Sequence, residues 1–232
     1  MNSEKNCKDK AKKRKKKQGN FLYDFVRVTG AVPMLLYMRP KILYPYGKCD
    51  AKGAVLISAN HSSLLDPISA LLAFKTRRLN SLATKDLYNT RLKAFFFNKM
   101  HCIVVDKDNF SMSSFHAVVE RLQENKAVLI FPEGKVNRES DNSLLAFKSG
   151  AVLMALKAKA PIQPIYIAKR DKWYHRQTIV KGAPIDVAAM AGERPTKADL
   201  DRISALIRER EIALKECCKE YLASKKKAKK IK

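Results

Sequence analysis

Residues 54–67 read AVLISANHSSLLDP, an apolar run that ends in a short polar loop. Apolar residues fill the first four positions, which predicts a strand buried on both faces. Asp66 and Pro67 are typical of a helix start, with Asp66 as the N-cap and Pro67 at the first helical position. The stretch therefore predicts a strand, a loop and a helix, the unit from which parallel α/β sheets are built.

The same alternation continues along the chain. Further strands are predicted at 79–84, 102–106, 127–131 and 162–168, and helices at about 67–75, 91–99, 113–125 and 144–158. A last helix is predicted from Thr196 to about Leu222, because Thr196 and Asp199 have capping-box spacing. No repeat and no Gly- or Pro-rich linker interrupts this pattern. We predict one α/β domain over residues 41–223, with a largely parallel central sheet covered by helices.

The chain of 232 residues is strongly basic, with 47 Lys and Arg against 22 Asp and Glu and a net charge of +25. Nine of the cations lie in residues 1–17 and six in residues 224–232. These two tails, 1–19 and 224–232, have the composition of solvated, disordered segments. A surplus of this size indicates an anionic partner: nucleic acid, an anionic membrane surface or a phosphorylated substrate.

Residues 20–40 follow the first basic tail and have apolar residues at helical spacing. Phe21, Phe25, Val28, Val32 and Leu35 fall on one face of the predicted helix. The uncharged run from Val28 to Met38 is too short to span a bilayer, and Pro33 interrupts it. A polybasic segment joined to an amphipathic helix is typical of a protein that lies on a membrane. The alternative is that this face packs on the core.

Several chemistries are disfavoured by the sequence. The five cysteines are odd in number and have no CxxC spacing, which argues against disulfides and a structural zinc site and for a reducing cytoplasm. His101, His116 and His175 are isolated and lack metal-ligand spacing. No glycine-rich nucleotide loop and no GxSxG elbow occurs, so we predict no metal, no cofactor and no hydrolysis through Ser62.

Polar residues follow two of the predicted strands. His61 comes directly after the first strand, with Asp66 one short loop away. A carboxylate at this place can accept one imidazole N–H and leave the other nitrogen free to take a proton from a hydroxyl. Glu133 and Gly134 follow the strand at 127–131. Because the carboxyl ends of parallel strands share one edge of the sheet, we expect both groups in one site.

These two strand ends resemble a known family. NHSSLLDP (60–67) is similar to the NHxxxxD motif of the glycerolipid acyltransferases, which include the 1-acyl-glycerol-3-phosphate acyltransferases, and FPEG (131–134) is similar to their second signature. CIVVDK (102–107), LLAFKSG (144–150) and PIQPIYI (161–167) also resemble family segments. The resemblance covers roughly residues 20–190.

The resemblance implies a function and roles for individual residues. His61 would act as general base on a glycerol hydroxyl that attacks an acyl thioester, and Asp66 would orient it. Glu133, with Gly134, would belong to a motif that binds the acceptor or organises the site. Cations would hold the acceptor phosphate: Lys107 and Lys135, Arg138 and Lys85. Lys135 and Val136 stand where the family commonly has Thr-Arg or Ser-Arg, so Arg138 is the candidate replacement.

The implied substrates are acyl-CoA or acyl carrier protein as donor and a lysophospholipid as acceptor. The implied location is the cytoplasmic face of the cell membrane, with peripheral or monotopic attachment to an anionic surface. Acylation of another lysolipid, a catalytically idle membrane adaptor and a basic nucleic-acid-binding module are the alternatives. Against the nucleic-acid alternative, the basic runs of this sequence contain no interleaved aromatic residues. The sequence also shows no helix-turn-helix, RNA-binding or zinc-finger pattern, so we predict no specific nucleic acid partner.

Overall fold

A computed structural model describes residues 21–106, 111–137, 143–170, 172, 174–192 and 194–230. Its centre is a seven-stranded sheet with the order β1-β7-β6-β2-β5-β3-β4. The strands are β1 (Lys41–Leu43), β2 (Val55–Ala59), β3 (Leu79–Thr84), β4 (Ile103–Val105), β5 (Ala127–Ile130), β6 (Ile162–Ile167) and β7 (Thr178–Lys181). Neighbouring strands are parallel except for the β6–β7 pair. The predicted α/β class with a largely parallel sheet is confirmed.

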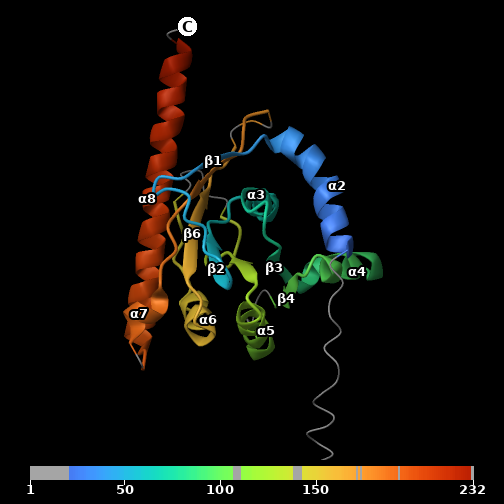
Figure 1. Ribbon diagram of the computed structural model, residues 1–232, viewed down its shortest axis with the longest axis vertical. Helices are drawn as coiled ribbons and strands as arrows, with labels where there is room; N and C mark the ends of the chain where they lie inside the picture. Colours follow the sequence, from blue (N-terminus) through green and yellow to red (C-terminus); the bar gives the residue numbers. More distant parts are fainter. Residues whose placement is uncertain are drawn as a thin grey trace, which may run out of the picture.

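Helices cover both faces of this sheet (Figure 1). They are α2 (Phe21–Met38), α3 (Asp66–Ala73), α4 (Arg91–Lys99), α5 (Met112–Gln123), α6 (Gly150–Ala158), α7 (Val187–Ala191) and α8 (Lys197–Lys230), with a 3-10 turn η1 (Lys85–Tyr88).

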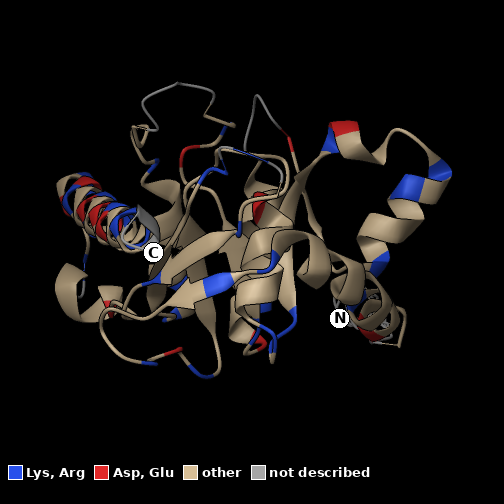
Figure 2. Cartoon of the chain, turned by 90° about the horizontal axis from the view of Figure 1, so that it is seen from above, with Lys and Arg blue, Asp and Glu red and all other residues tan. Residues whose placement is uncertain are grey.

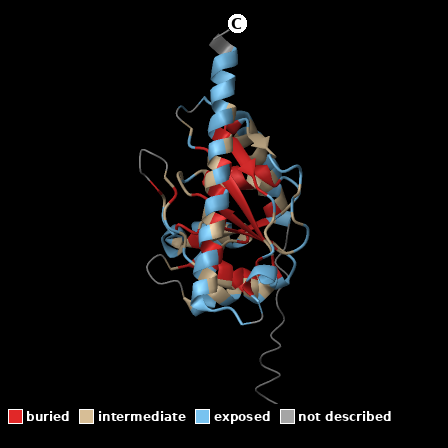
Figure 3. Cartoon of the chain, turned by 90° about the vertical axis from the view of Figure 1, so that its left-hand side faces the viewer, coloured by how far each residue is buried: buried red, intermediate tan, exposed pale blue. Residues whose placement is uncertain are grey.

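Strand β2 runs through the middle of the core. Its residues alternate between the two faces, as the period of a strand requires. Leu56 packs toward the side of α5, α6 and α8, whereas Val55 and Ile57 pack toward α3. All five β2 residues are buried, and in Figure 3 the buried colour is concentrated in the sheet. The strand that carries the His61 loop is therefore fixed by apolar contacts on both faces.

Several parts of the secondary structure differ from the prediction, and the short helix α7 and the turn η1 were not predicted. Strands β1 and β7, with three and four residues, were not predicted, although the equally short β4 and β5 were. The helix predicted at 144–158 begins only at Gly150, since the backbone of the preceding segment bonds to other parts of the chain instead. Helix α8 continues to Lys230 and includes most of the tail predicted to be disordered. Lys and Ala favour helix, and no Gly or Pro stops it.

Helix α2 stands apart from the sheet, but both of its ends contact the domain (Figure 1). At the first end, the Tyr23 hydroxyl accepts the Leu79 N–H (2.9 Å) and donates to the Leu79 carbonyl (3.3 Å), and Arg78 pairs with Asp24 through two hydrogen bonds. At the other end, Met38 is buried. There the Met38 carbonyl accepts the N–H of Gln177, and Arg170 lies over the ring of Tyr37. The helix is thus held at both ends.

The apolar stripe predicted for α2 does not pack on the core. Phe21, Phe25, Val28, Val32 and Leu36 are between 54% and 83% exposed. Four of the five residues predicted for the stripe are exposed, and the fifth, Leu35, is half-buried. Leu36 takes the place of Leu35 on the exposed face. With 18 residues, α2 as a whole is long and apolar enough to be a candidate membrane-spanning helix by length and composition, although its uncharged run alone is not.

Candidate active site

The site begins where β2 ends, at Asn60. Its side chain donates to the carbonyl of Ile167 (3.0 Å) and accepts the Ile167 N–H (2.7 Å), so it continues the pairing of β2 with β6 by one step. Asn60 is buried and both polar ends of its amide are satisfied. The backbone therefore leaves the sheet at a fixed point, and His61 is the first residue beyond it.

Asp66 organises the loop that carries His61. A single oxygen, Oδ2, lies 3.1 Å from Nδ1 of His61 and accepts the N–H groups of Ser62 (2.6 Å) and Ser63 (2.7 Å). Asp66 is buried, whereas His61 remains partly accessible. The carboxylate fixes the imidazole with Nδ1 as donor, which leaves Nε2 as the proton acceptor.

Asp66 is not the helix N-cap that the sequence predicts. The N-cap position is taken by Leu65, and no side chain caps α3. Asp66 is the first residue of the helix, and its carboxylate turns back to the Ser62 and Ser63 amides of the preceding loop rather than forward. The side chain therefore stabilises the histidine loop instead of the helix end.

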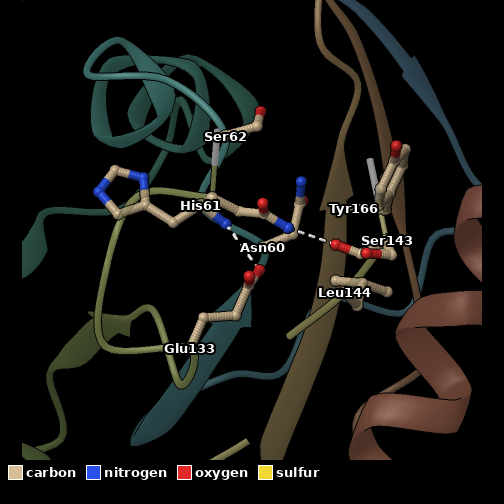
Figure 4. Close-up of a pocket in the computed structure, with 8 residues that line it drawn as sticks. Asn60, His61, Ser62, Glu133, Ser143, Leu144 and Tyr166 are labelled. Atoms are coloured by element: carbon tan, nitrogen blue, oxygen red, sulfur yellow. Dashed lines mark hydrogen bonds between the residues drawn. The ribbon is translucent and has the colours of Figure 1, made fainter. Parts of the chain in front are cut away.

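Glu133 holds the same loop from the end of β5 (Figure 4). Its Oε1 accepts the His61 N–H (3.1 Å), and its Oε2 accepts the Leu145 N–H (3.3 Å). Glu133 is buried, and desolvation raises the pKa of its carboxyl group. In Figure 4 the His61 imidazole points away from this carboxylate, so Glu133 fixes the backbone of His61 and not its ring.

Two further contacts complete the setting of His61. The Phe131 ring stacks on the imidazole with a centroid distance of 4.1 Å, and the Asn137 N–H donates to the His61 carbonyl (2.6 Å). A cavity of about 10 Å³, the size of one water molecule, lies between Asn60, Glu133 and Tyr166. The histidine is thus fixed at its backbone carbonyl, its N–H, one ring face and one ring nitrogen.

A larger cavity adjoins the other side of the loop. Its volume is about 210 Å³, and it is lined by Ser62, Ser63, Leu65, Asp66, Ala168, Lys169, Arg170 and Gln177. It joins the histidine loop to the segment that follows β6, which also contacts the end of α2. This is the larger of the two cavities found beside the site in the described part of the chain.

The predicted phosphate-binding cations have different outcomes. Lys107 and Arg138 lie outside the described residues. Nζ of Lys85 lies 2.8 Å from Oδ2 of Asp106, so this ammonium group already forms an ion pair with a carboxylate. Lys135 is exposed beside Gly134, whose φ of +72° forms the turn after Glu133. These four assignments remain predictions.

Lys148 was not predicted as a site residue. A Cβ atom at Gly134 would lie 3.1 Å from Nζ of Lys148. The Lys148 N–H also donates to the Pro132 carbonyl (3.1 Å), which holds the two segments together. The sequence hint was Phe147-Lys148-x-Gly150, which resembles a family segment.

Other chemistries find no support in the geometry. No group of His, Cys, Asp and Glu that could hold a metal ion occurs among the described residues. The Ser62 hydroxyl has no hydrogen-bond partner in the described part of the chain, so it is not paired with His61. His101 is buried and its ring stacks on that of Tyr23, with 4.9 Å between the ring centroids. It belongs to no cluster of potential metal ligands among the described residues.

Comparison with known proteins agrees with this geometry. The family model described as Acyltransferase matches residues 39–168, which include β2, the histidine loop, Glu133 and β6. The chain belongs to the Acyltransferase family. The match ends at Ala168, so β7, α7 and α8 lie beyond it.

Two curated relatives of the chain carry the same name. The chain is 29% identical to the 1-acyl-sn-glycerol-3-phosphate acyltransferase of Bacillus subtilis, over 58% of this chain and 66% of that protein. It is 30% identical to the Helicobacter pylori protein of the same name, over 55% of this chain and 54% of that one. The chain thus spans between about half and two thirds of the length of these relatives.

A solved structure has the same fold. The crystal structure of the 1-acyl-sn-glycerophosphate acyltransferase of Thermotoga maritima superimposes with a TM-score of 0.61 at 16% identity. The superposition covers 85% of this chain and 80% of the other.

Proposed function

We propose that the protein transfers a fatty acyl group from an acyl thioester to the free hydroxyl of 1-acyl-glycerol-3-phosphate, giving phosphatidic acid. The observation that carries the proposal is the His61–Asp66 pair at the end of β2, with Nε2 of His61 hydrogen-bonded to no residue in the described part of the chain. The names of the relatives supply the acceptor. The donor is acyl-CoA or acyl carrier protein.

The proposed reaction needs one proton transfer by the protein. Nε2 of His61 takes the proton from the acceptor hydroxyl while its oxygen bonds to the thioester carbonyl carbon. The tetrahedral species collapses, the carbon–sulfur bond breaks, and the imidazolium returns the proton to the leaving thiolate. Asp66 stabilises the imidazolium through Nδ1, at 3.1 Å. The ester forms without a covalent acyl-enzyme.

We assign the acceptor phosphate to the cations around the turn after Glu133. Lys148 is the described cation with the strongest support, because its ammonium group lies over Gly134. Lys135 adjoins it, and Lys107 and Arg138 remain candidates from the sequence. A lysine binds phosphate as a point charge, without the planar fork of arginine.

The proposed location is the surface of an anionic membrane, on its cytoplasmic face. Support comes from the exposed stripe of α2, whose two ends both contact the same domain. A helix held in this way favours lying in the interface over crossing the bilayer. Helix α4 adds to the surface: it has no buried residue, and Leu92, Phe95 and Phe96 are exposed beside Arg91 and Lys99.

The direct test supplies the purified protein with radiolabelled acyl-CoA or acyl carrier protein in phospholipid vesicles. Acyl transfer that requires added lysophosphatidate, with labelled phosphatidic acid as product, is the expected result. Lysophosphatidylcholine and monoacylglycerol serve as competing acceptors. Transfer only to one of these would replace the acceptor, and the absence of transfer to every acceptor would refute the enzyme assignment.

A further inference from the structure

Helix α8 reaches the site although it lies beyond the residues matched by the family. Arg208 donates through Nε to the carbonyls of Leu145 (3.0 Å) and Leu144 (3.2 Å), and through a second guanidinium nitrogen to Leu144. These are the residues that form the irregular segment before α6. The same segment was predicted to be helical, and its carbonyls are available to Arg208 because they make no helical hydrogen bonds.

Hydrogen bonds link this segment to His61 through Glu133. The N–H of Leu145 donates to Oε2 of Glu133, and Oε1 of the same carboxylate accepts the His61 N–H. Arg208 therefore bonds to the two carbonyls of a segment whose N–H group supports Glu133, which in turn supports His61. Each link is a hydrogen bond between groups that are at least partly buried.

A second side chain of α8 reaches the catalytic strand. Glu211 is fully buried, and its Oε1 accepts the hydroxyl of Ser58 at 2.6 Å. Ser58 lies on β2, three residues before His61. Burial raises the pKa of Glu211 well above its ordinary value, so the neutral acid is favoured and no buried charge is left unpaired. One turn of α8 thus contacts both the segment that bonds to Glu133 and the strand β2 that leads to His61.

We propose that α8 is a positioning element of the active site, acting on His61 through Arg208 and Glu211. The inference rests on the proposed function for its kinetic readout, but not for its structural one. Neither side chain contacts the reacting groups, so neither is a catalytic residue. Their role is to hold the strand and the carboxylate that set the place of the imidazole, where small displacements are costly in rate.

The kinetic test compares Arg208→Ala with Arg210→Ala, a matched arginine that is exposed on the same helix. Arg208→Ala should lower kcat about 10- to 100-fold and change the KM of either substrate much less, whereas Arg210→Ala should leave both unchanged. Arg208→Lys should restore part of the rate, because an ammonium group can still donate to one carbonyl. Glu211→Gln should stay near the parent, and Glu211→Ala should not.

A double-mutant cycle separates positioning from general loss of stability. If Arg208 acts through Glu133, the effects of Arg208→Ala and Glu133→Gln on kcat are not additive. Additive effects, or a fall in kcat that tracks only the melting temperature, would overturn the proposal.

A second measurement does not depend on enzyme activity. The protein has four histidines, so selective ¹⁵N-histidine labelling gives few signals, and His61→Asn assigns that of His61. Arg208→Ala should shift the His61 backbone and ring signals and leave His116 and His175 unchanged, whereas Arg210→Ala should shift none of them. An unshifted His61 would refute the inference even in an active enzyme. A shifted His61 in a protein that acylates nothing would uphold it and refute the proposed function.

Discussion

At the scale of single residues, the Asp66 carboxylate makes three of the contacts that hold the histidine loop. One oxygen accepts two backbone N–H groups and faces the imidazole. In the proposed reaction the negative charge matters most when His61 becomes an imidazolium, whereas the two amides need only an acceptor. Loss of charge and loss of the acceptor should therefore have different consequences.

Asp66→Asn keeps an acceptor oxygen but removes the charge. We expect kcat to fall about 10²-fold and the free energy of unfolding to fall by about 1–3 kcal/mol. Steady-state rates and urea denaturation measure the two effects. Asp66→Ala should unfold more easily still, since both serine N–H groups lose their acceptor. Full activity in a folded Asp66→Asn protein would remove the carboxylate from the mechanism.

The sequence predicts the reacting groups better than their supports. His61 and Asp66, and the support Glu133, follow from polar residues placed at strand ends, because the carboxyl ends of parallel strands meet at one edge. Asn60, Lys148 and Arg208 act through side-chain and main-chain contacts across long sequence separations. Except for Lys148, whose segment resembles a family motif, no local pattern marks these residues, since each contact depends on the packing of a distant element.

His101 gives the fold a pH dependence near the first end of α2. Burial lowers the pKa of its imidazole, and the nearby Lys126, Arg121 and Arg78 lower it further, while Asp24 opposes them. Its ring stacks on Tyr23. The unfolded chain binds the proton more readily than the folded one, so stability is complete above the ordinary value of 6.5 and is lost as the pH falls below it.

We therefore expect the free energy of unfolding to decline between about pH 7.5 and about pH 5.5, and to decline less in His101→Phe, which keeps a ring but cannot bind a proton. Urea denaturation at the two pH values measures the difference between the proteins. His116→Phe is the matched control, because that histidine is exposed. Parallel declines in the parent and in His101→Phe would show that His101 does not cause the effect.

At the scale of elements, the segments with apolar runs or helical spacing were predicted, whereas β1, β7 and α7 were not. Thr196 and Asp199 form the predicted capping box, with the Thr196 N–H and the Asp199 N–H each donating to the other side chain. The segment before α6 was predicted wrongly because its apolar spacing suits a helix, whereas its backbone groups bond to Glu133 and Arg208. Tertiary contacts there outweigh local propensity.

The exposed stripe of α2 leads to a prediction for this element. Phe25→Asp and Val28→Asp should each weaken binding to vesicles that contain anionic lipid by about tenfold or more, because a carboxylate replaces an apolar contact in the interface. Co-sedimentation measures the binding.

Leu222→Asp is the matched control for these variants, because Leu222 is an exposed apolar residue of α8. Figure 1 shows α8 and α2 on opposite sides of the sheet. The melting temperatures of all three should match that of the parent. Equal vesicle binding by the α2 variants and the control would place the membrane contact elsewhere.

At the scale of the whole molecule, the net charge of +25 acts together with the apolar surface. Lys and Arg are distributed over many described elements rather than confined to the site (Figure 2). Electrostatic attraction to an anionic surface weakens with salt, whereas apolar insertion does not. Binding that uses both should therefore lose strength with salt without vanishing.

We expect vesicle affinity to fall between about 0.05 M and about 0.5 M salt and to level off above zero. Deletion of residues 1–17 should flatten this dependence, and deletion of residues 1–38 should abolish binding. Vesicles of neutral lipid alone should bind weakly at all salt concentrations. A 1–38 deletion that binds as tightly as the full chain would contradict the proposed anchor.

The central claim is that the free nitrogen of His61 is the base for acyl transfer, and one substitution tests it most directly. His61→Asn removes the base and leaves no large void, with His116→Asn as the control. The rate of lysophosphatidate-dependent acyl transfer should fall about 10²- to 10⁴-fold, while the melting temperature and vesicle binding stay at parental values. A folded, vesicle-bound His61→Asn protein that keeps more than about a tenth of the parental rate would contradict the account.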